Sequence, residues 1–211
     1  MNRLLASKWT KRVLFVLCLV PLGILAWRGY QGDLTANPIE FITHYTGDWT
    51  LRFLLITLTV TPLRTLLNLP QLTRFRRMFG LYAFFYGVCH FSIWFVLDKY
   101  FSLPEMWADV IKRRYITVGM LGLLIMVPLA VTSTAGWVKR LGWVRWQKLH
   151  RIVYVAPAAG VVHYWWLVKS DIRLPAMYGA ILAVLMGYRV WLWTRKKAPI
   201  PKRAQPVPSA G

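Results

Sequence analysis

Six apolar runs divide this sequence of 211 residues. A helix needs about 20 mainly apolar residues to cross a bilayer, because the hydrocarbon core is about 30 Å thick. The runs lie at 13–30, 51–67, 79–97, 115–134, 150–168 and 175–194. The second is short and begins beside Arg52, and the fifth contains two histidines, so hydropathy alone supports only the other four. With 57% hydrophobic residues and a mean hydropathy of +0.43, the chain is outside the range of ordinary soluble domains. We therefore predict an all-α, polytopic membrane protein, a bundle of six transmembrane helices.

The basic residues predict how this bundle is oriented. The chain carries a formal net charge of +20. The N-terminal segment, the connections at 64–77 and 136–149 and the C-terminal tail hold 17 Lys and Arg residues, whereas 31–50, 98–114 and 169–174 hold six. The positive-inside rule therefore places both termini in the cytoplasm. Because the charges punctuate apolar runs and do not form one soluble patch, we expect no nucleic-acid partner.

The sequence predicts a single folded unit. We expect residues 1–12 to be a cytoplasmic segment, residues 13–195 to be the six-helix transmembrane domain and residues 196–211 to be a disordered cytoplasmic tail with several prolines. No small-x-small cleavage site follows Trp27, so we expect the first helix to be retained. There is no nucleotide-binding fingerprint and no soluble domain, so any cofactor must lie among the helices or at their ends.

Two of the four histidines are predicted to lie at the same depth in the membrane. His90 is about 15 Å along the third helix, and His163 is about 20 Å beyond His150, which begins the fifth run. Both helices run outward. Ionisable side chains are rare in membrane helices and by default indicate a functional site. Imidazoles from two neighbouring helices can take both axial positions of a haem iron, which suits electron transfer. The sequence therefore predicts His90 and His163 as iron ligands.

His150 and His163 are not predicted to lie on the same face of the fifth helix. Thirteen residues at 100° each leave His150 and His163 about 140° apart around an ideal helix. Pro157 lies between them, and a proline can kink or locally rewind a helix, which would correct the phase. Without that correction only one of the two can face a given pocket, and His163 is then the ligand. The sequence leaves the role of His150 open.

Simpler explanations exist for each of these features. A histidine can hydrogen-bond to a neighbouring helix, which contributes about 0.6–2 kcal/mol, although the matched depth of His90 and His163 favours ligation for that pair. His44 is expected just before the second helix, either as its cap or near the outer face of a cofactor, and we favour a structural role. The small residues at 156–160 ("APAAG") suit close helix packing and a flat porphyrin equally well.

Four segments carry a resemblance to a known family. They read "HYTGDWTLRFLLITLTVTPLR" at 44–64, "RFRRMFGLYAFFYGVCH" at 74–90, "RRYITVGMLGLL" at 113–124 and "TSTAGWVKRLGWVRWQKLHRIVYVAPAAGVVHYWW" at 132–166. In combination they resemble the MsrQ (YedZ) family, a branch of the ferric-reductase-like transmembrane domain superfamily. The resemblance extends over about residues 13–195.

The resemblance implies a multi-pass haem b protein of the bacterial inner membrane. Such proteins are the partner, in a heterodimer, of a periplasmic molybdopterin-dependent methionine sulfoxide reductase. They pass it electrons from the quinone pool, with FMN as a further cofactor, so that oxidised methionines in periplasmic proteins are repaired. The family's candidate haem-ligand histidines match His90, His150 and His163.

One departure from the wider superfamily affects the number of haems. There, two helices each carry two histidines and hold two haems, but in this chain Arg76 stands fourteen residues before His90. The resemblance therefore leaves one or two haems possible, and His150 is open to a second haem, a quinone or a flavin.

We expect an electron-transfer subunit of an oxidoreductase system that is not itself the catalytic reductase. The alternative is a proton or small-solute transporter that uses the buried histidines. Against the transporter, the sequence shows no inverted repeat and no acid or lysine within the apolar runs. A plain membrane anchor is the third possibility, and it predicts that His90 and His163 are dispensable.

Overall fold

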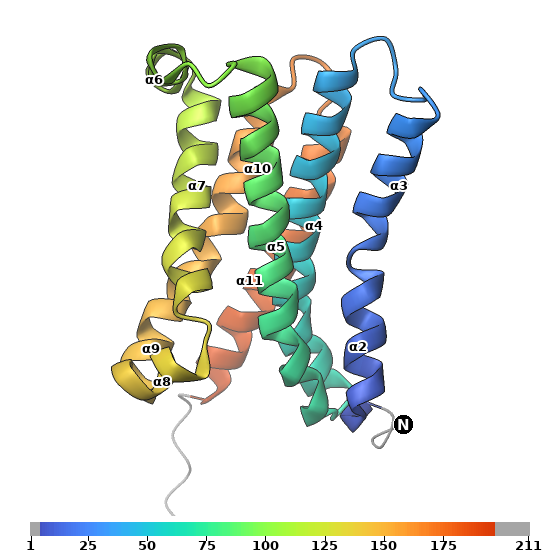
Figure 1. Ribbon diagram of the computed structural model, residues 1–211. Coiled ribbons are helices and arrows are strands. Elements are labelled where there is room, and N and C mark those ends of the chain that lie inside the picture. The colour runs from blue at the N-terminus through green and yellow to red at the C-terminus, as the bar shows by residue number, and fades with distance from the viewer. Residues whose placement is uncertain (1–4, 197–211) are drawn as a thin grey trace, which may run out of the picture.

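The computed structural model describes residues 5–196, and this part of the chain folds into helices without a strand, which confirms the all-α prediction (Figure 1). The expected disordered tail lies outside the described residues from position 197 onward. The elements are α2 (Lys8–Leu17), α3 (Val20–Tyr30), α4 (Pro38–Leu66), η1 (Pro70–Leu72), α5 (Thr73–Ile93), η2 (Trp94–Asp98), α6 (Leu103–Lys112), α7 (Arg114–Val131), α8 (Ala135–Leu141), α9 (Trp143–His150), η3 (Arg151–Tyr154), α10 (Val155–Leu167) and α11 (Arg173–Lys196).

The long helices run alternately up and down the bundle (Figure 1). The first upward path joins α2 to α3, α4 returns, and α5, α7, α10 and α11 continue the alternation. Helix α6 lies at one end of the bundle, and α8 and α9 lie at the other. Helix α2 begins and helix α11 ends at this second end. We call these the α6 end and the α8–α9 end.

Four segments among the described residues are long and apolar enough to cross a membrane: Lys8–Tyr30, Pro70–Asp98, Arg114–Val131 and Arg173–Arg195. They coincide with the four runs that hydropathy alone supported. Helix α4 contains several charged residues and α10 has only 13 residues, yet both pack among the other four. A count of six spans and the cytoplasmic location of the termini stay predictions.

The second helix is longer than the apolar run predicted. It begins at Pro38, because the Asn37 side chain accepts a hydrogen bond from the backbone N–H of Glu40 and donates one to the Glu40 carboxylate. Within the helix, the hydroxyls of Thr43, Thr46 and Thr50 donate to carbonyls four residues earlier, which satisfies them without water. The expectation that His44 precedes or caps the helix is therefore wrong.

The first crossing is interrupted between α2 and α3. Pro21 has no N–H to donate, and the N–H of Leu19 bonds to Val16, so the Phe15 carbonyl loses its usual helical partner. The hydroxyls of Tyr82 and Tyr86 on α5 donate to the carbonyls of Phe15 and Cys18, at 2.7 Å and 2.9 Å. A neighbouring helix thus supplies the donors that the break requires in an apolar medium.

Two clusters of buried side chains hold the bundle together. In the first, Phe53 of α4 stacks on Tyr82 and Tyr86 of α5, with ring centroids 5.6 Å and 5.3 Å apart. In the second, Leu51, Leu55 and Leu58 of α4 pack with α11, whose side chains in the cluster are Tyr178, Leu182 and Leu185. Because α4 belongs to both clusters, it is the central helix of the bundle.

Replacing Tyr82 by phenylalanine tests the repair of the broken helix. We expect Tyr82→Phe to lower the free energy of unfolding by roughly 1 kcal/mol, because the Phe15 carbonyl is left without a donor while the aromatic packing is kept. Thermal unfolding in detergent measures this change. Tyr30→Phe is the matched control, since Tyr30 is 83% exposed, and it should leave the unfolding temperature unchanged. Equal effects of the two variants would contradict this role of the Tyr82 hydroxyl.

Candidate functional site

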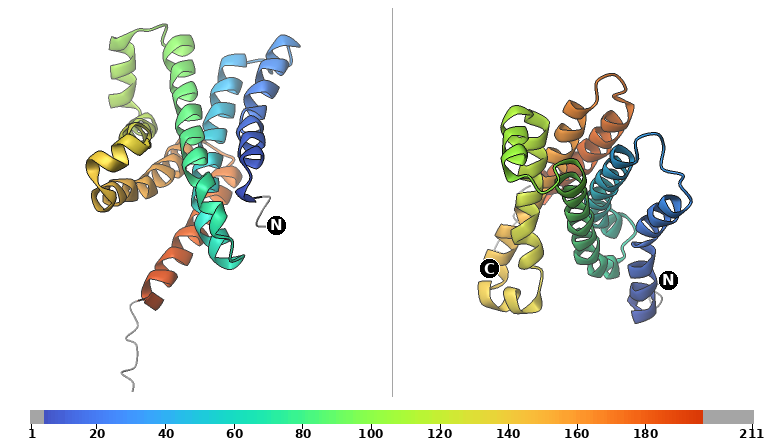
Figure 2. Two further views of the ribbon diagram at one scale, coloured as in Figure 1. Left: turned by 60° about the horizontal axis from the view of Figure 1, so that its bottom comes forward. Right: turned by 45° about the horizontal axis from the view of Figure 1, so that its top comes forward.

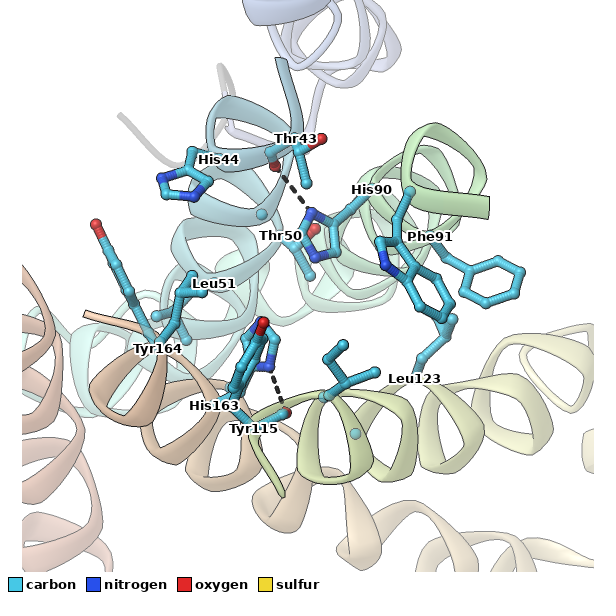
Figure 3. A pocket seen from close by; sticks show the side chains of 18 of the residues that line it. Thr43, His44, Thr50, Leu51, His90, Phe91, Tyr115, Leu123, His163 and Tyr164 are labelled. Atoms are coloured by element: carbon cyan, nitrogen blue, oxygen red, sulfur yellow. Dashed lines mark hydrogen bonds between the residues drawn. The ribbon is translucent and has the colours of Figure 1, made fainter. Parts of the chain in front are cut away.

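A cavity of about 540 Å³ opens between α4, α5, α7 and α10 in the half of the bundle toward the α6 end (Figure 3). Its volume lies in the range of sites that hold small molecules and cofactors. The inner walls are apolar, with Leu54, Leu123, Met126 and Ala156 among the lining residues. Polar and charged side chains lie at the rim: Asn37, Glu40, His44, Asp98 and Arg113. The cavity therefore suits a ligand with an apolar body and a polar edge.

His90 of α5 and His163 of α10 meet across this cavity. Their ring centroids are 6.1 Å apart, and the ring planes are nearly perpendicular, at 85°. Figure 3 shows the two side chains reaching into the cavity from different helices. The structure therefore brings together the two histidines that the sequence places at the same depth.

Each imidazole is held by a backbone carbonyl of a neighbouring helix. Nδ1 of His90 lies 2.8 Å from the carbonyl oxygen of Thr43 on α4, and Nδ1 of His163 lies 2.6 Å from that of Tyr115 on α7. A carbonyl only accepts, so both Nδ1 atoms must donate their proton. In the neutral ring Nε2 then carries a free lone pair, which is the tautomer that a metal ligand needs.

Two glycines make room for these rings. A Cβ at Gly47 would lie 3.1 Å from the His90 ring, and one at Gly119 would lie 2.6 Å from Nδ1 of His163. Each glycine stands four residues after the carbonyl that accepts the hydrogen bond, so it lies on the same face of its helix. The two pairs, Thr43 with Gly47 and Tyr115 with Gly119, form equivalent cradles on α4 and α7.

The distance between the rings fits an iron ion between them. Two metal–nitrogen bonds of about 2 Å, added to the radii of both imidazole rings, separate the ring centroids by about 6 Å. The observed 6.1 Å agrees with that separation. A haem leaves two axial positions to the protein, and one imidazole on each side fills both. The residues present thus fit a haem by number, tautomer, spacing and cavity volume.

Two further residues of α4 reach this site. His44 is exposed and lies at the rim, where Figure 3 places it beside Thr43. Asp48 also lines the cavity, and its carboxylate is 3.6 Å from the guanidinium of Arg52. Arg52 in turn donates to the Tyr178 hydroxyl at 2.9 Å, which links the pair to α11. The predicted apolar runs contain no acid, but α4 begins before the second run, so Asp48 lies within a helix of the bundle.

The structure does not bring His150 to this cavity. It ends α9 at the α8–α9 end, where its Nε2 lies 3.0 Å from the Thr132 hydroxyl and the Trp146 ring stacks on it at 3.9 Å. The positive charges of Arg76 and Arg77 act on it from α5. The predicted single helix from 150 is thus divided, because the 3₁₀ turn η3 separates α9 from α10.

This turn changes the phase between the two histidines of the fifth run. A 3₁₀ helix turns about 120° per residue and an α-helix about 100°, so four residues of η3 add about 80°. The ideal separation of about 140° between His150 and His163 falls to about 60°. The change in winding therefore occurs in η3, before Pro157, which is the third residue of α10.

The sequence did not indicate every residue that forms the site. Gly47, Gly119 and the two accepting carbonyls were missed, and the only available signal was a glycine within an apolar helix. The small residues at 156–160 contribute to helix packing and to the cavity wall, while room for a porphyrin stays a prediction. Ala159 packs against Gly122 of α7, whereas Ala156 and Gly160 line the cavity.

Comparison with known proteins identifies the family. The family described as "Ferric reductase like transmembrane component" matches residues 46–161. Many relatives carry the name "Protein-methionine-sulfoxide reductase heme-binding subunit MsrQ". The one from Herminiimonas arsenicoxydans is 51% identical over 189 residues, 88% of this chain and 87% of the relative. The one from Caulobacter vibrioides is 48% identical over 179 residues, 85% of each chain.

The third relative, from Xanthomonas euvesicatoria pv. vesicatoria, is 44% identical over 205 residues, 94% of each chain. No solved structure is significantly similar to this chain. The matches cover nearly the whole of both chains, and the described helices include four that can cross a membrane. The chain is thus a multi-pass bacterial membrane protein, and it belongs to the MsrQ family within the ferric-reductase-like transmembrane proteins.

Proposed function

We propose that this protein is the haem-binding, electron-transfer subunit of a methionine sulfoxide reductase system, with His90 and His163 as axial ligands of a haem b. The observation that carries the proposal is the pair of opposed imidazoles, 6.1 Å apart, each with its Nδ1 proton held by a carbonyl. The names of the relatives, which describe heme-binding subunits, support the same assignment. A haem b held here supplies an iron that alternates between its ferric and ferrous forms.

The residues of the chain have distinct tasks in this proposal. The Thr43 and Tyr115 carbonyls keep both imidazoles in the Nδ1–H tautomer and fix their rotation, which leaves both Nε2 atoms directed into the cavity. The apolar walls would contact the body of a haem. His90 and His163 would together hold the iron of a haem, as expected for a subunit that transfers electrons and leaves bond chemistry to a partner.

We further propose the donor and the acceptor of the electrons that this subunit transfers. Electrons come from the quinone pool, with FMN as an additional cofactor, and leave to a periplasmic molybdopterin-dependent methionine sulfoxide reductase. The cavity lies toward the α6 end, which the positive-inside rule places on the periplasmic side. That position supports delivery to a periplasmic partner. In vesicles that contain the protein, a reduced quinone alone should produce the spectrum of ferrous haem; a requirement for added FMN would place flavin before haem.

His150 is proposed to serve a second cofactor site at the α8–α9 end. Its Nε2 faces the Thr132 hydroxyl, and Arg76 stands in place of a partnering histidine on α5. A second haem there would need an unusual partner ligand, and a quinone or flavin would use His150 as a hydrogen-bonding group. The number of haems per chain separates these alternatives.

A transporter is the second candidate, because Asp48 adds an acid to the polar groups on the cavity side of α4. A chain of ionisable groups is what a proton relay needs. However, the Asp48 carboxylate is already paired with Arg52, and the two imidazoles donate to carbonyls. Proton flux into vesicles without any redox donor would favour the transporter over electron transfer.

Haem content per chain in histidine variants tests the ligands. We expect His90→Ala and His163→Ala each to lose the haem of this cavity, because a single imidazole leaves one axial position of the iron unfilled. His150→Ala should lose only part of the haem and His44→Ala should lose none. The pyridine haemochrome absorbance of purified protein gives the count. Unchanged haem in His163→Ala, or a wild-type sample without a Soret band, would overturn the proposal.

The glycine cradles allow a test that leaves both ligands in place. In Gly119→Ala the new Cβ would lie 2.6 Å from Nδ1 of His163, so the ring must shift and haem content should fall at least several-fold. Alanine favours a helix over glycine by about 1 kcal/mol, so the loss cannot come from helix propensity. Gly23→Ala is the matched control, since a Cβ there has nothing within 4 Å. Equal haem content in the two variants would show that the cradle is not needed.

A further inference from the structure

Helix α6 carries an apolar stripe that no part of the described chain covers. Leu103, Trp107 and Ile111 are spaced at i, i+4 and i+8, so they share one face of the helix. They are 61%, 61% and 77% exposed. Tyr100 and Phe101, which precede the helix, are exposed as well. A contiguous apolar surface of this kind marks an interaction site.

The charged residues of α6 lie on the opposite side from this stripe. At 100° per residue, Glu105 and Lys112 are about 160° and 140° from Trp107. The face that packs on the protein contains the buried Val110, which is about 60° from Trp107. This face lies between the apolar stripe and the charged side. The helix therefore presents one side to the protein, one side to apolar surroundings and one side to water. This division is typical of a helix that lies in the plane of a membrane interface.

The position of α6 on the bundle agrees with this division. The helix lies across the bundle axis at the top of α7 and projects beyond the other helices (Figures 1 and 2). The Thr117 hydroxyl of α7 donates to the Val110 carbonyl of α6 and thereby joins the two helices. Thr117 shares a face of α7 with Leu121 and Leu124, which are exposed apolar side chains on a helix long enough to cross a membrane. Helix α6 is thus attached to a lipid-facing side of the bundle.

We infer that α6 is an interfacial helix that inserts Leu103, Trp107 and Ile111 among the lipids of the leaflet at the α6 end. The stripe continues the lipid-facing surface of α7, and Glu105 and Lys112 face the water above it. Trp and Tyr are the residues that anchor at the boundary between headgroups and acyl chains, and Trp107 and Tyr100 occupy such positions. A protein partner that covered the stripe would not require the charged residues to lie on the opposite side.

This contact would determine the height of the cavity mouth relative to the membrane surface. Asp109 of α6 binds Lys99 at 2.7 Å and Arg113 at 3.3 Å, one at each end of the helix. The hydrogen bond to Asp109 raises the pKa of Lys99, so this ammonium stays charged. Arg113 and Asp98, the neighbour of Lys99, both line the rim of the cavity. Lipid contact along α6 is therefore transmitted to the rim through Asp109.

Spin labels on α6 test this placement in the complete protein. Single cysteine variants are made at five positions of α6: Leu103, Glu105, Trp107, Ile111 and Lys112. Each variant is labelled with a nitroxide and reconstituted into vesicles of phosphatidylethanolamine and phosphatidylglycerol. The parent protein, with only Cys18 and Cys89, supplies the background signal. Oxygen, which concentrates in the bilayer, and a water-soluble nickel chelate each relax the labels that they reach.

Labels at 103, 107 and 111 should respond strongly to oxygen and weakly to the chelate, and labels at 105 and 112 should show the reverse. This periodic pattern is expected without any partner protein. Chelate access at 107 and 111 equal to that at 105 and 112 would overturn the inference. Chelate access that disappears only when a purified methionine sulfoxide reductase is added would also overturn it, because the stripe would then be a protein docking surface. Since the labels report on α6 alone, failure here leaves the haem assignment intact.

Discussion

The arrangement of the helices depends on two hydrogen bonds from imidazole Nδ1 atoms to backbone carbonyls. In an apolar interior an unpaired imidazole N–H is costly, and the carbonyls of Thr43 and Tyr115 remove that cost. Each bond can form only if α5 approaches α4, and α10 approaches α7, closely enough for the ring to reach the main chain. Gly47 and Gly119 permit that approach. The cavity is the space left between these two closely packed pairs.

Helix α4 shows how a polar segment can lie inside such a bundle. Its threonine hydroxyls bond to the preceding turn, and the charge of Arg52 is met by Asp48, the Tyr178 hydroxyl and the Trp49 ring. None of these groups depends on water for a partner. The hydrogen bond from Arg52 to Tyr178 also joins α4 to α11, so the polar side of α4 contributes to the packing of the bundle as well as to the wall of the cavity.

The sequence predicted those features that depend on helix geometry alone. A rise of 1.5 Å per residue is enough to place His90 and His163 at one depth, and the structure has them facing each other. It did not predict where α4 begins, because a hydropathy window counts polar side chains without regard to the direction they face. The glycine cradles were also missed, since their role depends on which helix lies opposite, and that is a property of the fold.

The division of the fifth apolar run into two helices was beyond sequence reasoning for a related reason. Whether residues 151–154 wind as a 3₁₀ or an α-helix depends on how α9 is held. Its Trp146 and His150 side chains both bond to Thr132, which is brought near only by folding. Pro157 suggested an irregularity and gave no position for it. The family resemblance indicated three histidines as candidate haem ligands and left the role of His150 open, and the geometry separates them into a facing pair and a distant third.

The short turn η3 separates the helix that ends at His150 from the helix that carries His163. Because the chain changes its winding between His150 and His163, the direction of the first can be adjusted by one or two residues in the turn without moving α10. A relative could therefore exchange the chemistry at its α8–α9 end, by insertion or substitution in this joint, while the ring that faces His90 keeps its place.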